Sequence, residues 1–184
     1  SRASALICAM ELERISDTNL LGEWPFEIGL WVGLAATPNK LGKVSNDKYS
    51  VRERLRYLKQ GKDVGKPLPL ENCPWCDHPF DDKRSFSIDN QDNPKRMFVS
   101  CLNNKCDFFR GKGKNLPIIA VDEEIYRRLP CFIIATVDKF ASMPFDGHIA
   151  GIFGKVNRND SNGFYGASEP STGNQMGGQL LPPD

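Results

Sequence analysis

The sequence predicts an α/β fold that is interrupted by a small cysteine-bound ribbon. Nearly continuous apolar runs at 26–33 and 116–121 are typical of strands buried on both faces, and segments with helical periodicity accompany them. Between the runs stand two close pairs of cysteines separated by 24 residues: Cys73 and Cys76, then Cys101 and Cys106. We therefore expect one α/β unit, formed by 1–39 and 116–146, with an insertion at 40–115.

The first element expected is a helix at 3–16. Its apolar side chains fall along one side and its charged side chains largely along the other: Leu6, Ile7, Met10 and Ile15 against Glu11, Glu13 and Arg14. We expect the apolar side to pack on the core and the charged side to face solvent. The run at 26–33 then gives a buried strand, and Thr-Pro-Asn at 37–39 ends this unit.

A second helix is expected at 50–61. Ser50 and Glu53 have the spacing of a capping box, and Gly61 stands where a C-terminal cap belongs. Its apolar seam consists of Val51, Leu55 and Leu58. The opposite side carries Arg52, Arg56 and Lys59, which fit either contact with phosphates or simple exposure to solvent.

The insertion is basic although the whole chain, at +1, is nearly neutral. Residues 40–114 hold 17 Lys and Arg against 10 Asp and Glu, a net charge of +7, and the flanks carry −6. A basic stretch in a near-neutral chain fits contact with a polyanion, and it equally fits a solvated surface.

The four cysteines of the insertion have the spacing of a zinc ribbon. Each short knuckle presents two thiolates to one point, as a tetrahedral zinc ion requires. Strands are expected at 85–88 and 97–100, joined by the turn-rich stretch 89–94. Four thiolates fill the tetrahedron, so we predict a structural Zn²⁺ and assign no role at the metal to His78. The alternatives are two disulfides or four unrelated thiols.

The α/β pattern resumes at 116–121 and continues to 146. The next helix has acids in its first turn and arginines in its last, which matches the helix dipole: Asp122, Glu123 and Glu124, then Arg127 and Arg128. A third, buried strand at 131–135 leads into Thr136 and a short helix. Cys8 and Cys131 are interpreted as small buried hydrophobes. Residues 147–184 are rich in Gly, Asn and Ser in their first part, and we expect a long loop or partial disorder there.

Two motifs hint at phosphate chemistry. Residues 118–123 have the shape of a Walker B strand, so an ATPase using Asp122 and Glu123 is one hypothesis. Such a site also needs a phosphate loop, and the nearest approach at 61–67 is one residue short and ends in proline. Helix capping explains the acids more simply. Thr136 fits a phosphate site at a helix start, or an ordinary N-cap.

The stretch 132–141, Phe-Ile-Ile-Ala-Thr-Val-Asp-Lys-Phe-Ala, resembles the strand-to-helix segment of superfamily 2 helicases that touches the sugar-phosphate backbone of the bound strand. A longer set of segments, at 28–33, 37–39 and 121–145, resembles the large helicases of the DISARM anti-phage defence system. The resemblance implies a partial RecA-like parallel sheet of the first motor domain, with the zinc ribbon at about 71–110 as its insertion.

The same resemblance implies nucleic-acid contacts by Thr37, Thr136 and Lys139, to which the basic side of the second helix would add Arg52 and Arg56. It places the phosphate loop before residue 1 and the Asp-Glu-x-His box after residue 184. ATP and Mg²⁺ would then be bound by the parent protein only, and this segment would be inactive alone. The expected partners are single-stranded DNA or RNA, the remainder of the helicase chain and other defence proteins.

No signal peptide and no apolar run long enough for a bilayer is found in the sequence, so we expect no membrane contact and a cytoplasmic location. The main rival hypothesis, from a different class, is a stand-alone zinc-ribbon module that binds nucleic acid or protein without a motor.

Overall fold

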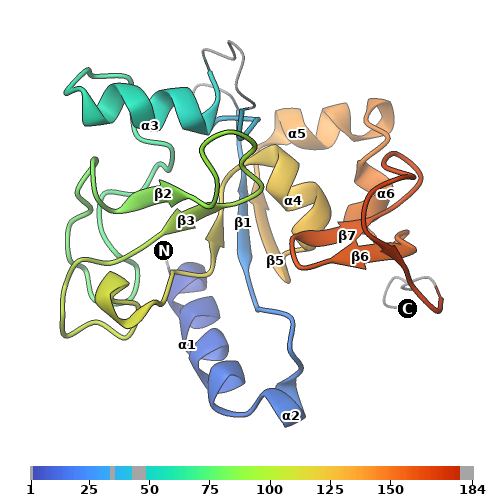
Figure 1. Cartoon of the computed structure of the whole chain (residues 1–184), viewed down its shortest axis with the longest axis horizontal. Coiled ribbons are helices and arrows are strands. Elements are labelled where there is room, and N and C mark those ends of the chain that lie inside the picture. Colours follow the sequence, from blue (N-terminus) through green and yellow to red (C-terminus); the bar gives the residue numbers. More distant parts are fainter. Residues whose placement is uncertain (1, 34–35, 43–48, 179–184) are drawn as a thin grey trace.

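The computed structural model describes residues 2–33, 36–42 and 49–178. Its centre is a parallel sheet in the order β4-β1-β5, formed by β4 (Ile118–Ile119), β1 (Ile28–Trp31) and β5 (Phe132–Ala135). Ile28 pairs with both Ile118 and Phe132. In Figure 1 the strands run upward, so that their carboxyl ends point toward α5 (Val137–Ser142). The expected mixed α/β class with a parallel sheet is confirmed.

Alternate residues of the central strand point into two different cores, because successive side chains of a strand face opposite sides of the sheet. Ile28 and Leu30 belong to the larger core, which also contains Ile7 and Cys8 of helix α1 (Arg2–Ser16). Trp31 belongs to a smaller core with residues of α4 (Asp122–Arg128) and α6 (Ile149–Ile152). Every residue of β1 is buried, as predicted.

Helix α1 buries Ile7 as predicted, but not the rest of the predicted apolar side. Leu6 is 61% exposed and Met10 is 36% exposed, whereas Glu11 and Arg14 are buried. The carboxylate of Glu11 accepts two hydrogen bonds from Arg14 at 2.8 Å and a third from the Phe26 amide. Arg14 also donates to the carbonyls of 22 and 23. Glu11 and Arg14 therefore pack inward because their polar atoms have partners in α1 and at 22–26, whereas Glu13 is exposed as predicted.

The remaining helices of the amino-terminal half are short. α2 spans Thr18–Leu21 and α3 spans Val51–Lys59. In α3 the hydroxyl of Ser50 accepts from the Glu53 amide at 3.4 Å, which confirms the capping interaction, and the predicted seam is buried. No helix in the described part of the chain is both long enough and apolar enough to cross a bilayer.

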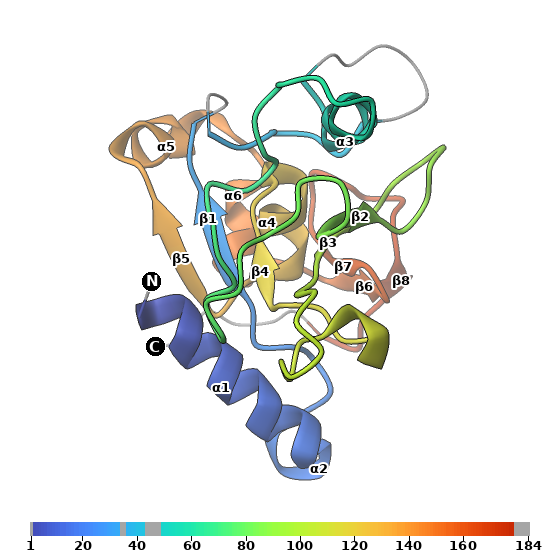
Figure 2. The same ribbon diagram turned by 90° about the vertical axis from the view of Figure 1, so that its left-hand side faces the viewer.

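The ribbon between the two cysteine pairs is an antiparallel hairpin of β2 (Phe86–Ile88) and β3 (Met97–Val99), with Phe86 opposite Val99. A one-turn helix η1 (Arg110–Lys112) follows it. Val99 also forms a bridge to Leu116, directly before β4. Figure 2 shows the result: the ribbon lies beside β4, and α5 lies at the opposite edge beyond β5. The hairpin is therefore joined to the sheet.

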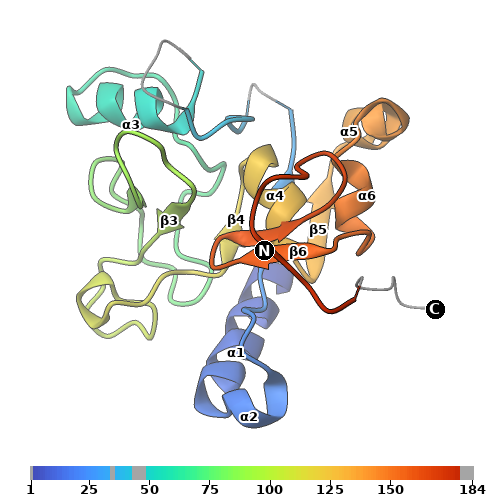
Figure 3. The same ribbon diagram turned by 45° about the vertical axis from the view of Figure 1, so that its right-hand side comes forward.

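The stretch 147–178, for which we predicted a loop or disorder, is folded. After η2 (Met143–Phe145) and α6 it forms an antiparallel sheet in the order β7-β6-β8. These strands are β6 (Arg158–Asp160), β7 (Gly163–Tyr165) and β8 (Asn174–Gln175), and Figure 3 shows them in front of α4 and β5. Gly163 is needed there, because a Cβ would lie 2.5 Å from the carbonyl oxygen of Arg127. The last six residues of the sequence lie outside the described part.

Candidate metal centre

The first cysteine knuckle is a tight turn closed by backbone hydrogen bonds. The Cys73 amide donates to the carbonyl of His78 at 2.8 Å, and the Asp77 amide donates back to the carbonyl of Cys73 at 2.9 Å. Asp77 has a φ of 60°, which turns the chain sharply just after Cys76. The turn fixes both thiols on the same side of the chain.

The second knuckle begins where β3 ends. The Cys101 amide donates to the carbonyl of Phe108 at 3.2 Å, and the Cys106 amide donates to the carbonyl of Asn103 at 3.0 Å. Side chains join the two knuckles: the indole of Trp75 donates to Asp107 at 2.8 Å and packs edge-on against Phe108. Both knuckles are therefore held independently of the sulfur atoms.

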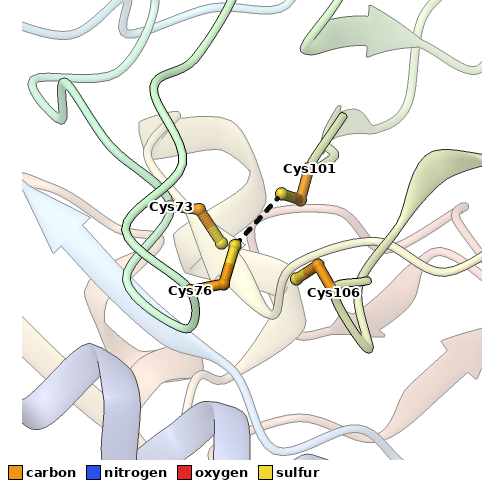
Figure 4. A group of neighbouring side chains, drawn as sticks. All are labelled: Cys73, Cys76, Cys101 and Cys106. Atoms are coloured by element: carbon orange, nitrogen blue, oxygen red, sulfur yellow. Dashed lines mark hydrogen bonds between the residues drawn. The ribbon is translucent and has the colours of Figure 1, made fainter. Parts of the chain in front are cut away.

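The four sulfur atoms converge on one point. Figure 4 shows the four thiol side chains turned toward one another. Their Sγ atoms all lie within 4.8 Å of each other, and those of Cys76 and Cys101 are 3.5 Å apart. Zinc–sulfur bonds of about 2.3 Å place the corners of a tetrahedron about 3.8 Å apart. The arrangement fits a tetrahedral ion, and all four thiols are free rather than paired in disulfides.

The surroundings of the sulfurs bear on cation binding in two ways. Burial raises the pKa of Cys73 to about 12 and also raises the pKa of Cys106, so a cation must displace the protons of these thiols when it binds. Asn103 supplies partners for the resulting charge: its amide donates to the sulfur of Cys101 at 3.4 Å and its side chain to that of Cys76 at 3.6 Å. Four thiolates occupy every position of a tetrahedral ion, so the centre suits a structural role.

The predicted nucleic-acid contacts do not form one surface. Thr37 is completely buried, and its hydroxyl donates to the carbonyl of Val32 at 3.4 Å. Arg52 and Arg56 lie on α3, and the Arg56 guanidinium is 2.6 Å from the carboxylate of Glu53. The third member of this basic side, Lys59, is exposed at the end of the helix.

Thr136 and Lys139 lie together at the carboxyl ends of the parallel strands. Thr136 is exposed at the start of α5, and its amide donates to the carbonyl of Trp31 at 3.2 Å. The Lys139 ammonium lies 2.5 Å from a carboxylate oxygen of Asp122, the first residue of α4. We call these four residues, Trp31, Asp122, Thr136 and Lys139, the carboxyl edge. The strand that leads into it, β5, is half-exposed, and not buried as predicted.

Asp122, Glu123 and Glu124 all make contacts inside the fold, so their role is not limited to capping α4. Asp122 pairs with Lys139, and the Glu123 carboxylate accepts from the Leu41 amide at 2.8 Å. Glu124 is buried and accepts from the Met97 amide of the ribbon at 3.2 Å. Burial raises the pKa of Glu124 to about 8.

Sequence reasoning missed a second buried charge cluster. Glu27, just before β1, receives hydrogen bonds from Arg128 at 2.7 Å and from Arg96 of the ribbon at 3.0 Å. Glu27 and Arg128 are 3% and 1% exposed. No local sequence signal indicates which of several arginines near a helix end will turn inward.

The two cysteines outside the cluster differ in burial. Cys131, predicted to be buried, is exposed, whereas Cys8 is buried as expected.

No family model matches this chain. A stretch of 158 residues is 37% identical to the DISARM protein DrmA of Bacillus paralicheniformis. The chain is related to a DISARM protein. The matched stretch covers 85% of this chain but only 14% of that relative, so the chain spans a small part of the length of the protein it matches.

Proposed function

We propose that this chain is part of an anti-phage defence protein of the DISARM type, in which a zinc-bound ribbon stabilises a domain that contacts nucleic acid. The relation to DISARM protein DrmA supports the defence role. The convergence of the four thiols of the ribbon, all within 4.8 Å, is the observation that supports the zinc site. Zn²⁺ would be held by Cys73, Cys76, Cys101 and Cys106, and its contribution is folding free energy rather than chemistry.

The domain is proposed to be a partial RecA-like unit of a superfamily 2 helicase, with the ribbon as its insertion. Its support is the all-parallel order β4-β1-β5 together with the residues at the ends of these strands. In open parallel sheets ligands bind outside the carboxyl ends of the strands. Thr136 lies exposed at that position, and we assign the strand contact to Thr136 and Lys139.

The rest of the motor is proposed to come from other parts of the parent protein. ATP and Mg²⁺ would bind there, since Asp122 and Glu123 are already engaged by Lys139 and the Leu41 amide. β5 is one of the two edge strands of the sheet among the described residues, and Phe132 on it is 46% exposed. This edge suits packing against a further segment of the polypeptide.

Two measurements on the purified chain test this proposal. Metal analysis should give one zinc per chain, lost in Cys76→Ser. Fluorescence anisotropy with a labelled single-stranded oligonucleotide should detect weak, sequence-independent binding that falls steeply with salt. Absence of zinc would remove the ribbon assignment, and absence of binding at low salt would remove the nucleic-acid assignment.

The rival binding module makes a different prediction for the same titration. The basic α3 places Arg56 half-exposed and Arg52 partly exposed, on the side of the molecule that carries the ribbon. If the double variant Arg52→Ala with Arg56→Ala loses binding and Thr136→Val keeps it, a zinc-ribbon module without a motor would be favoured.

A further inference from the structure

The carboxyl edge contains a cation that is already neutralised. The Lys139 ammonium lies 2.5 Å from Oδ2 of Asp122 and 5.9 Å from the centre of the Trp31 ring. The side chains of Lys139 and Asp122 are 13% and 9% exposed. A phosphate group that approaches Thr136 therefore meets a lysine whose charge is shared with an internal carboxylate.

This ion pair is only partly satisfied. Oδ1 of Asp122 and the indole Nε1 of Trp31 are buried, and neither forms a hydrogen bond of good geometry with the described residues. Burial raises the pKa of Asp122, whereas Lys139 and the nearby Trp31 indole act to lower it, and the negative charge of Asp146 adds to the increase. A partly buried pair gains little net free energy, because the cost of desolvating both charges offsets their attraction.

We propose that Asp122 competes with nucleic-acid phosphate for Lys139, so that binding of a strand exchanges the carboxylate for a phosphate oxygen. This inference rests on the proposed nucleic-acid contact at the carboxyl edge, and it adds Asp122 as the residue that sets the strength of that contact. Lysine suits such an exchange, because its ammonium is a point charge on a flexible stem and can turn from one anion to another.

The charge balance favours exchange over simple addition. A phosphate brings one negative charge to a site that already holds one carboxylate for one ammonium. If both anions stayed near Lys139, the second would repel the first at close range. Thr136 caps the start of α5, three residues before Lys139. Residues with this spacing lie on the same side of a helix, so a phosphate at the Thr136 hydroxyl would lie on the same side of α5 as the lysine stem.

Substitution of Asp122 by Asn tests the exchange directly. The amide keeps the shape of the side chain and removes its charge, so Asp122→Asn should bind a single-stranded oligonucleotide roughly threefold to tenfold more tightly, the effect of releasing one weak ion pair. The matched control is Asp138→Asn, which removes the same charge from an exposed acid on α5 that has no ion pair in the described structure. Asp138→Asn should change the affinity much less.

A second variant shows whether the gain passes through Lys139. In Asp122→Asn combined with Lys139→Gln, the gain should disappear, and the slope of log K against log salt should become less steep by about 0.7, the value for one phosphate contact on a single strand. Melting curves of each variant report on folding. If Asp122→Asn proves unstable, Asp122→Ser serves the same comparison.

The outcomes separate this inference from the proposed function. Binding that is weakened by Lys139→Gln but unchanged in Asp122→Asn, or equally strengthened by Asp138→Asn, would overturn the exchange and leave the nucleic-acid contact in place. Failure of both the unmodified chain and Asp122→Asn to bind at low salt would overturn the proposed function itself.

Discussion

The candidate metal centre, formed by the four cysteines, and the carboxyl edge differ in how completely the chain satisfies its own polar groups. At the metal centre the backbone closes both knuckles, and all four sulfurs face one point. At the carboxyl edge one ion pair is formed, while an oxygen of Asp122 and the indole nitrogen of Trp31 stay buried without a well-formed hydrogen bond in the described structure. A closed site stabilises the fold, whereas an incompletely satisfied one leaves room for a ligand.

The two regions also differ in how they connect to the core. Cys73, Cys101 and Cys106 belong to the same buried cluster as Ile28 and Leu30 of the central strand. Lys139 lies on the short helix α5 and Thr136 caps its start, and this helix has no fully buried residue. Changes at the metal centre should therefore affect the whole fold, and changes at the carboxyl edge should affect mainly binding.

Loss of the proposed zinc ion should have the largest effect. Chelation, or Cys101→Ser, should abolish cooperative thermal unfolding, because structural zinc contributes roughly 10 kcal/mol or more to the folding of small domains. Circular dichroism melts with and without chelator measure this. The control is Cys131→Ser, which removes an exposed cysteine outside the centre and should leave the melt unchanged. A chain that melts identically with and without chelator would contradict the contrast between the two regions.

Removal of the Arg128 side chain should have the second-largest effect on stability. Its guanidinium is 2.7 Å from Glu27, and both side chains are nearly inaccessible. Arg128→Ala would leave a buried carboxylate with only Arg96, so we expect a loss of about 3 kcal/mol or more in unfolding free energy, measured by urea denaturation. The double variant with Glu27→Gln should recover part of that loss.

Glu124, which lies outside both regions, should give the protein a pH-dependent stability. Its pKa is raised from 4.5 to about 8 by burial, so the folded state keeps the proton at pH values where the unfolded state has lost it. The unfolding free energy should therefore decline as pH rises from about 4.5 to about 8. Glu124→Gln should flatten this decline, as urea denaturation of both proteins at several pH values would measure. An unchanged profile would mean that the nearby arginines keep Glu124 ionised.

The smallest effect on stability is expected at the carboxyl edge. Lys139→Gln should lower the unfolding free energy by about 1 kcal/mol or less, because its pair with Asp122 is only partly buried and desolvation offsets it. A thermodynamic cycle with Asp122→Asn isolates the pair. A coupling as large as the loss in Arg128→Ala would show that the carboxyl edge is a structural site after all.

Local signals in the sequence were sufficient for several elements. The cysteine spacing predicted the cluster that the structure brings together, because each knuckle is a turn of a few residues. The buried strand at 28–31 and the cap at Ser50 also follow from neighbouring residues alone. The β2–β3 hairpin was predicted within one residue at each end.

The errors arose where the deciding partner is distant or the element is very short. Arg14 turns inward because carbonyls at 22 and 23 receive its hydrogen bonds, and the helix sequence holds no sign of them. Glu124 is buried against an amide 27 residues away in the sequence. The strands β6, β7 and β8 have two or three residues each, too few for an alternating pattern to be recognised.

The pairing of β1 with β4 has a consequence for how the chain folds. Gly29 lies beside Ile119, so the sheet closes only after the entire ribbon-containing segment has been looped back. Closing so long a loop has a large entropic cost that must be met before the strand contacts form. An ion that joins the two knuckles early would shorten the effective loop, because Val99 of the ribbon already bridges to Leu116. Zinc should then accelerate refolding as well as slow unfolding, and the order in which metal and chain are mixed should govern the refolding rate.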